Sequence, residues 1–214
     1  MDYPISSFLF WEVPKEKVHE FKFYEFLREY HEKNARHNPK ANINGNNDII
    51  AILDGQQRLT SLYIGLKGTY AYKLPRKNLQ AYPKRKLYLN LLRKSEIADS
   101  TYNFLFLTER EVEEENNDID KNGDHINYWF PVGEILNMEQ EYEVNSYLID
   151  NVLDLTKNKD QKIFANETLF KLFSVIHRRG IINYYLEQST ELDKILNIFI
   201  RVNSGGTELS YSDL

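Results

Sequence analysis

The sequence predicts an α+β fold, in which a mixed sheet core formed by the first half of the chain is followed by a mostly helical segment. Short apolar or alternating runs occur at 8–13, 49–53 and 102–107, and such runs are typical of strands. From residue 133 onward the apolar residues mostly recur three and four positions apart, the period of an amphipathic helix. We therefore expect residues 1–132 to form the sheet core and residues 133–214 the helical segment, together making one compact unit.

The composition excludes several classes of protein. The net charge of −5 argues against bulk electrostatic wrapping of nucleic acid, although a local basic groove stays open. The chain has no cysteine, so it has no disulfide, thiolate metal site or cysteine nucleophile. No apolar run approaches membrane-spanning length and no signal peptide begins the chain. We expect a cytoplasmic protein without a membrane partner.

The first elements are a strand over 8–13 and a helix within 14–34, the latter predicted from the spacing of Tyr24, Leu27 and Tyr30. Residues 38–47 are rich in Asn, Pro and Gly and predict a loop. The run from Ile49 to Leu53 is short and mostly β-branched, which is typical of a strand buried on both faces. It leads into the most informative stretch of the chain.

The hydrophobic period changes at the turn dipeptide Asp54-Gly55. Four apolar residues then fall at i, i+3, i+4 and i+7 and predict a helix that stops at Gly65 or Gly68: Leu59, Leu62, Tyr63 and Leu66. The first turn of a helix has backbone N–H groups without intrahelical acceptors and a partial positive charge. The junction is therefore suited to chemistry on an anion.

The side chains at this junction fit that chemistry. Arg58 has a planar, permanently charged fork that matches phosphate oxygens. Gln56 and Gln57 both donate and accept hydrogen bonds, Asp54 is a candidate ligand for Mg²⁺ or for a water, and Thr60 and Ser61 add hydroxyl groups: we group them as one candidate site. The alternative is structural, with Asp54 capping the helix, Arg58 pairing with a surface carboxylate and the glutamines solvated.

Further along, the chain predicts two neighbouring strands, from the alternation at Leu87, Leu89 and Leu91 and from the run at 102–107. A strand is also expected at 69–72. The acidic run at 109–124 predicts a mobile, solvated loop. His125 has no partner His or Asn at the spacing of a nuclease metal site, and the five histidines show no ligand spacing.

The second half predicts helical segments around 135–136, 147–155 and 164–176, a short strand at 181–186, and a helix at 192–203 that ends before a Gly-Gly pair. The chain ends at the start of another predicted helix, and the strand at 8–13 lies close to Met1. We therefore expect a domain that is truncated at both ends.

Two motifs of the chain resemble those of a known family. Residues 54–62, D-G-Q-Q-R-L-T-S-L, resemble the signature of GmrS-like N-terminal domains of GmrSD-type modification-dependent restriction systems, distant relatives of ParB and sulfiredoxin. Residues 199–214, F-I-R-V-N-S-G-G-T-E-L-S-Y-S-D-L, are similar to a second motif of that family, F-x-x-x-N-x-x-G-x-x-L-x-x-x-D-L. The resemblance implies a ParB/sulfiredoxin-like core that binds, and hydrolyses, a nucleoside triphosphate with Mg²⁺ in a defence system against foreign DNA.

The resemblance also implies residue roles. Asp54, Gln57 and Arg58 would be catalytic: Gln57 or its neighbour Gln56 would position the attacking water, and Asp54 would bind Mg²⁺ as the metal ligand or orient that water. The nucleotide would contact the following residues: Gly55, Gln56, Arg58, Thr60, Ser61, Asn203 and Gly206. The chain has no G-x-x-x-x-G-K-[ST] sequence, so this would not be a P-loop enzyme.

Two alternatives stay open at the level of sequence. In the first alternative, the junction is a ParB-like, Mg²⁺-dependent nuclease site that nicks DNA. In the second, it belongs to a nucleotide-binding or partner-binding module without turnover. Any contact with DNA is expected through a partner or a separate nuclease domain. The sequence leaves open which nucleotide is preferred, which DNA modification is recognised, and how many chains assemble.

Overall fold

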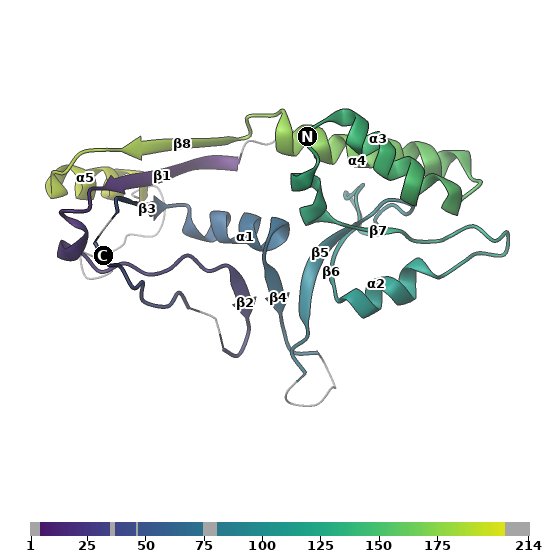
Figure 1. The fold of residues 1–214 in the computed structure, drawn as a ribbon, viewed down its shortest axis with the longest axis horizontal. Coiled ribbons are helices and arrows are strands. Elements are labelled where there is room, and N and C mark those ends of the chain that lie inside the picture. Colours follow the sequence, from purple (N-terminus) through teal and green to yellow (C-terminus); the bar gives the residue numbers. More distant parts are fainter. Residues whose placement is uncertain (1–4, 35–36, 46, 75–80, 204–214) are drawn as a thin grey trace. The chain divides into compact units, whose positions relative to one another are not determined.

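The computed structural model describes residues 5–34, 37–45, 47–74 and 81–203 (Figure 1). The chain forms two compact units, each built from separate stretches. Unit 1 takes the chain up to residue 27, residues 37–60 and the chain from residue 180 onward, and unit 2 takes residues 28–36 and 61–179. The α+β class predicted from the sequence is confirmed, while the likeness to ParB and sulfiredoxin stays a prediction.

Unit 1 contains a three-stranded sheet in the order β3-β1-β8. β1 (Ile5–Val13) is central, runs antiparallel to β3 (Ile49–Asp54) and parallel to β8 (Ile182–Glu187). The short helix η1 (Val18–Glu20) and the helix α5 (Leu192–Asn203) belong to the same unit. β8 pairs in parallel with β1, so strands from the two ends of the described chain belong to one sheet. The predicted boundary at 132/133 stays a prediction.

One face of this sheet packs into a small core. Trp11 and Val13 of β1 are buried together with Ile195 of α5, and Ile49, Ala51 and Leu53 of β3 pack against them. The strand at 49–53 is thus confirmed, but its burial on both faces is wrong. β3 is an edge strand of the sheet, and the side chain of Ile50, on the other face, is 65% exposed.

Unit 2 contains a second sheet in the order β2-β4-β5-β6, with β7 also paired to β5. Its strands are β2 (Glu29–His31), β4 (Thr69–Ala71), β5 (Lys84–Asn90), β6 (Phe104–Leu107) and β7 (Trp129–Pro131). β5 and β6 are antiparallel neighbours, as the sequence predicts. The helix α1 (Gln56–Leu66) starts in unit 1 and continues into unit 2.

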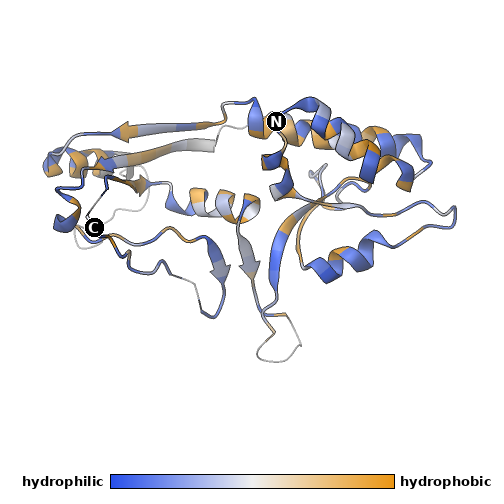
Figure 2. Cartoon of the chain, viewed as in Figure 1, coloured by the Kyte–Doolittle hydropathy of each residue, from blue (hydrophilic) through white to orange (hydrophobic). Residues whose placement is uncertain are grey.

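The helices of unit 2 complete its core. They are α2 (Glu109–Asn116), η2 (Val132–Asn137), α3 (Glu141–Asn151), η3 (Leu153–Leu155) and α4 (Lys159–His177). Phe130 of β7, Leu148 of α3 and Leu169 of α4 are fully buried in one cluster. In Figure 2 the apolar residues of α3 and α4 alternate with polar ones along each helix, which is the amphipathic pattern predicted for this part of the chain.

Two predicted elements differ from the structure. The helix expected within 14–34 is wrong: this segment holds η1, an isolated bridge at Tyr24 and the strand β2. β2 forms because it pairs in parallel with β4, where the rings of Tyr30 and Tyr70 stack with centroids 4.8 Å apart. Because this pairing depends on residues forty positions away, no local hydrophobic period in the sequence marks β2.

The loop expected at 109–124 is also wrong in its first half, because residues 109–116 form α2. Thr108 and Glu111 make a capping box, in which each side chain accepts a hydrogen bond from the other residue's backbone N–H. Although burial raises the pKa of Glu111, the hydrogen bonds from Thr108 and from the buried Arg85 lower it below the ordinary value overall. Local capping thus outweighs the repulsion within this acidic, hydrophilic helix (Figure 2).

Candidate functional site

The candidate site lies at the junction between β3 and α1, where the sequence places it. Asp54 is the last residue of β3, and α1 begins at Gln56. The backbone N–H of Leu59 donates to the carbonyl of Gly55 at 2.9 Å, which makes Gly55 the residue that opens the helix. The backbone N–H groups of residues 56–58 therefore precede the first intrahelical hydrogen bond of α1.

Gly55 is required at this position for two reasons. Its φ of +87° lies in the left-handed region, which residues with a Cβ rarely adopt. In addition, a Cβ here would lie 2.5 Å from Cδ1 of Phe8 and 3.2 Å from Nη2 of Arg58. The absence of a side chain lets the turn close tightly against the ring of Phe8.

Arg58 is held in place by two contacts within unit 1. Its Nη2 donates to Oδ2 of Asp54 at 2.9 Å, and its guanidinium carbon lies 5.1 Å from the centre of the Phe8 ring. The side chains of Arg58 and Asp54 are 34% and 24% exposed. Among the described residues, the other amino group of Arg58, Nη1, is buried without a hydrogen-bond partner. Arg58 therefore retains a donor that a ligand oxygen would satisfy.

An irregularity in the sheet turns Asp54 toward α5. From Val13 to Phe10 the register of β1 on β3 is regular, but Leu9 pairs with Asp54 and leaves Leu53 without a partner. Successive side chains of a strand point to opposite faces, so one extra residue shifts the face to which the next side chain points. As a result Asp54 lies in one row with Leu9 of β1 and Tyr185 of β8.

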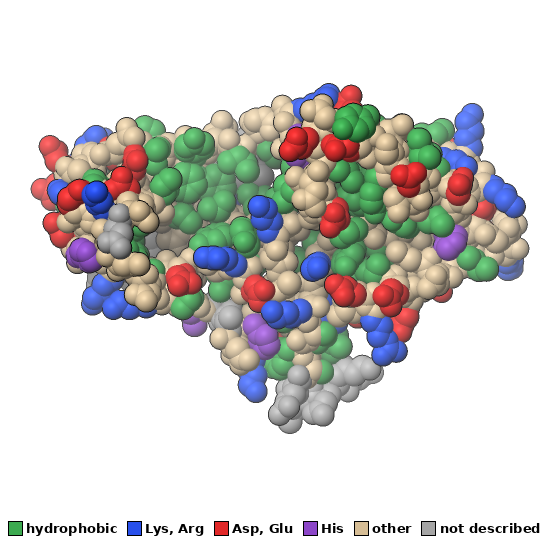
Figure 3. All heavy atoms as spheres, in the orientation of Figure 1, with side chains coloured by type: hydrophobic (Ala, Val, Ile, Leu, Met, Phe, Trp, Pro, Cys, Tyr) green, Lys and Arg blue, Asp and Glu red, His purple; other side chains and the backbone are tan. Residues whose placement is uncertain are grey.

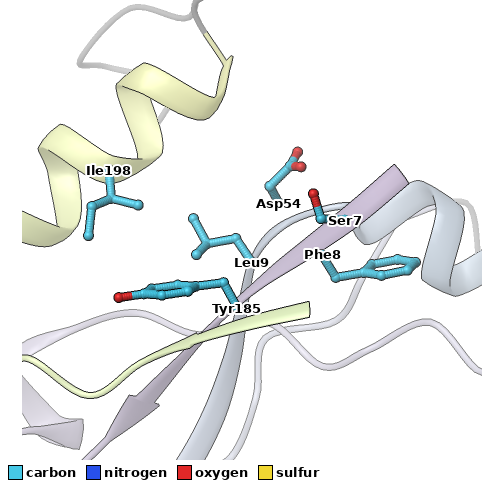
Figure 4. A pocket seen from close by; sticks show the side chains of 6 residues that line it. All are labelled: Ser7, Phe8, Leu9, Asp54, Tyr185 and Ile198. Atoms are coloured by element: carbon cyan, nitrogen blue, oxygen red, sulfur yellow. The ribbon is translucent and has the colours of Figure 1, made fainter. Parts of the chain in front are cut away.

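This row forms one wall of a cavity of about 310 Å³ inside unit 1. Figure 4 shows the cavity between the end of the sheet and α5, with Ile198 projecting from the helix toward Leu9 and Tyr185. Asp54 and Ser7 lie together on one side of it. The cavity thus has a polar end beside the β3–α1 junction and an apolar end under α5.

The next three predicted site residues, Gln56, Gln57 and Thr60, lie on α1. Gln56 donates from Nε2 to the carbonyl of Ile52 at 3.1 Å, so its side chain folds back onto β3. Gln57 follows it in the first turn of α1. Thr60 is two residues beyond Arg58 on α1, about 200° around an ideal helix, and thus faces nearly the opposite way.

The last predicted residues are less directly placed. Ser61 lies in the second turn of α1 and belongs to unit 2. Asn203 is the last residue of α5, the helix that covers the cavity, and its side chain lies outside the described residues. Gly206 also lies outside the described residues. The structure therefore brings together Asp54, Gly55 and Arg58, and places Gln56 and Gln57 in the same turn.

The donor set at Asp54 is compatible with Mg²⁺. Arg58 takes one oxygen of the Asp54 carboxylate, and the Ser7 side chain lies next to Asp54 in the cavity (Figure 4). Within the residues that the structure describes, no group of three or more His, Asp or Glu side chains is arranged to hold a metal ion. Mg²⁺ usually keeps several waters and binds through one or two carboxylates together with phosphate oxygens, and Asp54 is the residue that would hold it here.

Sequence reasoning missed five residues of the cavity wall: Ser7, Phe8, Leu9, Tyr185 and Ile198. The strands and the helix that carry them were predicted, but their pairing was not. Tyr185 joins Leu9 through a parallel pairing across more than 170 positions of the chain. The one available signal was that Asn203, a predicted site residue, ends the helix predicted over 192–203, which contains Ile198.

Comparisons with known proteins agree with the motif at the junction. A search of curated proteins found no match to the chain. The family model described as "GmrSD restriction endonuclease, N-terminal domain" matches residues 1–214, the whole chain. The junction of β3 and α1, with its D-G-Q-Q-R sequence, is accordingly found in a chain that belongs to the family of GmrSD restriction endonuclease N-terminal domains.

Proposed function

We propose that this restriction-system domain binds a nucleoside triphosphate at the junction of β3 and α1 and hydrolyses it. The observation that carries the proposal is the unsatisfied hydrogen-bond donor of Arg58. Arg58 is anchored by Asp54 and Phe8, yet its buried Nη1 has no acceptor among the described residues. A phosphate oxygen is the acceptor that such a guanidinium group binds best.

The first turn of α1 supports the same ligand. The N–H groups of residues 56–58 precede the first intrahelical bond, and the N-terminus of a helix has a partial positive charge. No acidic residue lies in this first turn. Arg58 and Asp54 neutralise each other, so a triphosphate needs further positive charge, which Mg²⁺ bound to Asp54 and to the phosphates would supply.

The two glutamines are assigned different roles. Gln56 is tied by its side chain to the carbonyl of Ile52, so it stiffens the turn and contributes its backbone N–H to the ligand. Gln57 is the residue that we assign to orient the attacking water, because a side-chain amide both accepts a hydrogen from water and donates to a phosphate oxygen. Arg58 stabilises the charge that develops on the transferred phosphate.

Phosphate release from ATP, GTP, CTP and UTP with Mg²⁺ tests this function. We expect turnover with at least one nucleotide, and we expect Arg58→Ala to lower kcat/KM at least a hundredfold, since arginine contacts to a transferring phosphoryl group are worth about 10³ or more. Arg110→Ala is the matched control. Arg110 also makes an i,i+4 ion pair, with Glu114, but on the exposed surface of α2.

Three other outcomes would count against the proposal. Full turnover in Arg58→Ala would remove the assigned role of Arg58. Binding without product would leave a non-catalytic module. Nicking of a supercoiled plasmid with Mg²⁺, abolished by Asp54→Ala, would instead identify a ParB-like nuclease. On the face seen in Figure 3, acidic side chains are interspersed with basic ones.

A further inference from the structure

The apolar end of the cavity in unit 1 has no role in the proposed phosphate chemistry. It is formed by Leu9, Tyr185 and Ile198, whereas Asp54 and Ser7 lie at the other end (Figure 4). We infer that this end binds the nucleobase of the nucleoside triphosphate, with the base stacked on the ring of Tyr185. The inference rests on the proposed function and adds the residues that hold the base.

The polarity of the cavity matches the two ends of a nucleotide. Ligand sites are typically lined by apolar and aromatic side chains with a few polar groups that fix orientation. Here the polar group is Asp54, which pairs with Arg58 at the start of α1. The phosphates of the nucleotide would therefore lie at this end of the cavity. The base end then points away from the junction, toward Tyr185 and Ile198.

The size of the cavity agrees with one base and its sugar. Binding pockets for small molecules are usually about 300–1,000 Å³. At about 310 Å³ this cavity lies at the lower limit. It is too small for a whole nucleotide with its triphosphate, and the phosphates would therefore lie outside it, at the N-terminus of α1.

Tyr185 is suited to stacking because its ring is both accessible and held. The residue is 55% exposed, although it lies in a strand that is paired along β1. Its hydroxyl donates to Oε2 of Glu187 at 3.4 Å, and the Glu187 side chain is fixed by the Ser189 backbone N–H at 2.7 Å and by Lys194 at 3.1 Å. A ring that is already oriented loses little conformational entropy when a base stacks on it.

Equilibrium binding of the four nucleoside triphosphates and of inorganic tripolyphosphate, each with Mg²⁺, tests the inference. Loss of a stacking aromatic costs about 5- to 100-fold in affinity. We expect Tyr185→Ala to weaken every nucleotide that binds by this factor and to leave tripolyphosphate unchanged. We expect Tyr185→Phe, which keeps the ring but loses the hydrogen bond to Glu187, to lose much less affinity than Tyr185→Ala.

Tyr184→Ala is the matched control, because Tyr184 is the adjacent residue of β8, is 65% exposed and does not line the cavity. Its affinities should equal those of the wild type. Unchanged nucleotide affinity in Tyr185→Ala, or an equal loss for nucleotides and tripolyphosphate, would overturn the inference. If the wild type binds tripolyphosphate as tightly as the nucleotides, the base site is refuted and the phosphate site stands. If the wild type binds neither, the proposed function itself fails.

Discussion

Replacing Gly55 by alanine tests the geometry of the junction without any ligand. The new Cβ would face a backbone φ of +87° and would lie 2.5 Å from Cδ1 of Phe8. The left-handed conformation costs a residue with a Cβ about 1–2 kcal/mol. Overpacking against a buried ring adds about 1–3 kcal/mol. We therefore expect Gly55→Ala to lower the free energy of unfolding of unit 1 by about 2–5 kcal/mol.

Gly123→Ala separates the two contributions. Gly123 has nearly the same φ, +83°, but no described atom lies within 4 Å of its would-be Cβ. Gly123→Ala should therefore lower the free energy of unfolding only by the conformational contribution, about 1–2 kcal/mol. The difference between the two substitutions measures the contact between Gly55 and Phe8.

The two tryptophans allow each unit to be followed by its own fluorescence during urea unfolding. Trp11 lies in unit 1 and Trp129 in unit 2. Gly55→Ala is measured in a Trp129→Phe background and Gly123→Ala in a Trp11→Phe background, each against its own parent. Equal costs would refute the close packing of Phe8 on Gly55. A Phe8→Leu substitution should reduce the cost of Gly55→Ala, because it removes the obstructing ring.

Two further predictions concern carboxylates. The hydrogen bond from the Ser189 backbone, helped by Lys194 and opposed by burial, lowers the pKa of Glu187 below its ordinary 4.5. The native state therefore binds fewer protons than the unfolded chain. The stabilisation by Glu187 is complete at a pH above the ordinary pKa and is lost as the pH falls through the lower native pKa. Urea unfolding followed by Trp11 from neutral pH to about pH 3 should therefore show an acid-dependent loss of stability that is weaker in Glu187→Gln, and an identical pH profile would contradict this role. Glu111→Ala should lower the stability of unit 2 by about 1–2 kcal/mol, because it removes the carboxylate half of the capping box of α2 and an acceptor of the buried Arg85. Exposed Glu114→Ala is the control, and equal effects of the two substitutions on the Trp129 transition would refute the capping argument.

The part of the site that the sequence predicts is the part made by neighbours in the chain. The apolar run at 49–53, the Asp54-Gly55 turn and the stripe from Leu59 to Leu66 each have a local period or a local turn signal, and β3 and α1 follow them. The pairing of Asp54 with Arg58 is also local in the chain, since it joins the residue before the Gly55 turn to the first turn of α1.

The missed parts depend on distant pairing or on a competing local signal. The cavity is made by β1, β8 and α5, and only their register brings Tyr185 and Ile198 to Asp54. β2 is three residues long and exists through β4. In α2 the Thr108–Glu111 capping box is a local signal for a helix, whereas the density of acidic residues that follows it favours a solvated loop.

In our proposal, Arg58 and the first turn of α1 bind the phosphates of a nucleotide. The most direct measurement is calorimetric titration of inorganic tripolyphosphate with Mg²⁺ into the wild type, Arg58→Ala and the control Arg110→Ala. Arg58 is partly exposed, so its loss should lower stability by no more than about 1–2 kcal/mol and leave the chain folded. We expect saturable binding to the wild type and to Arg110→Ala, and loss of this binding in folded Arg58→Ala. Equal binding by all three proteins, or by none of them, would contradict the proposal.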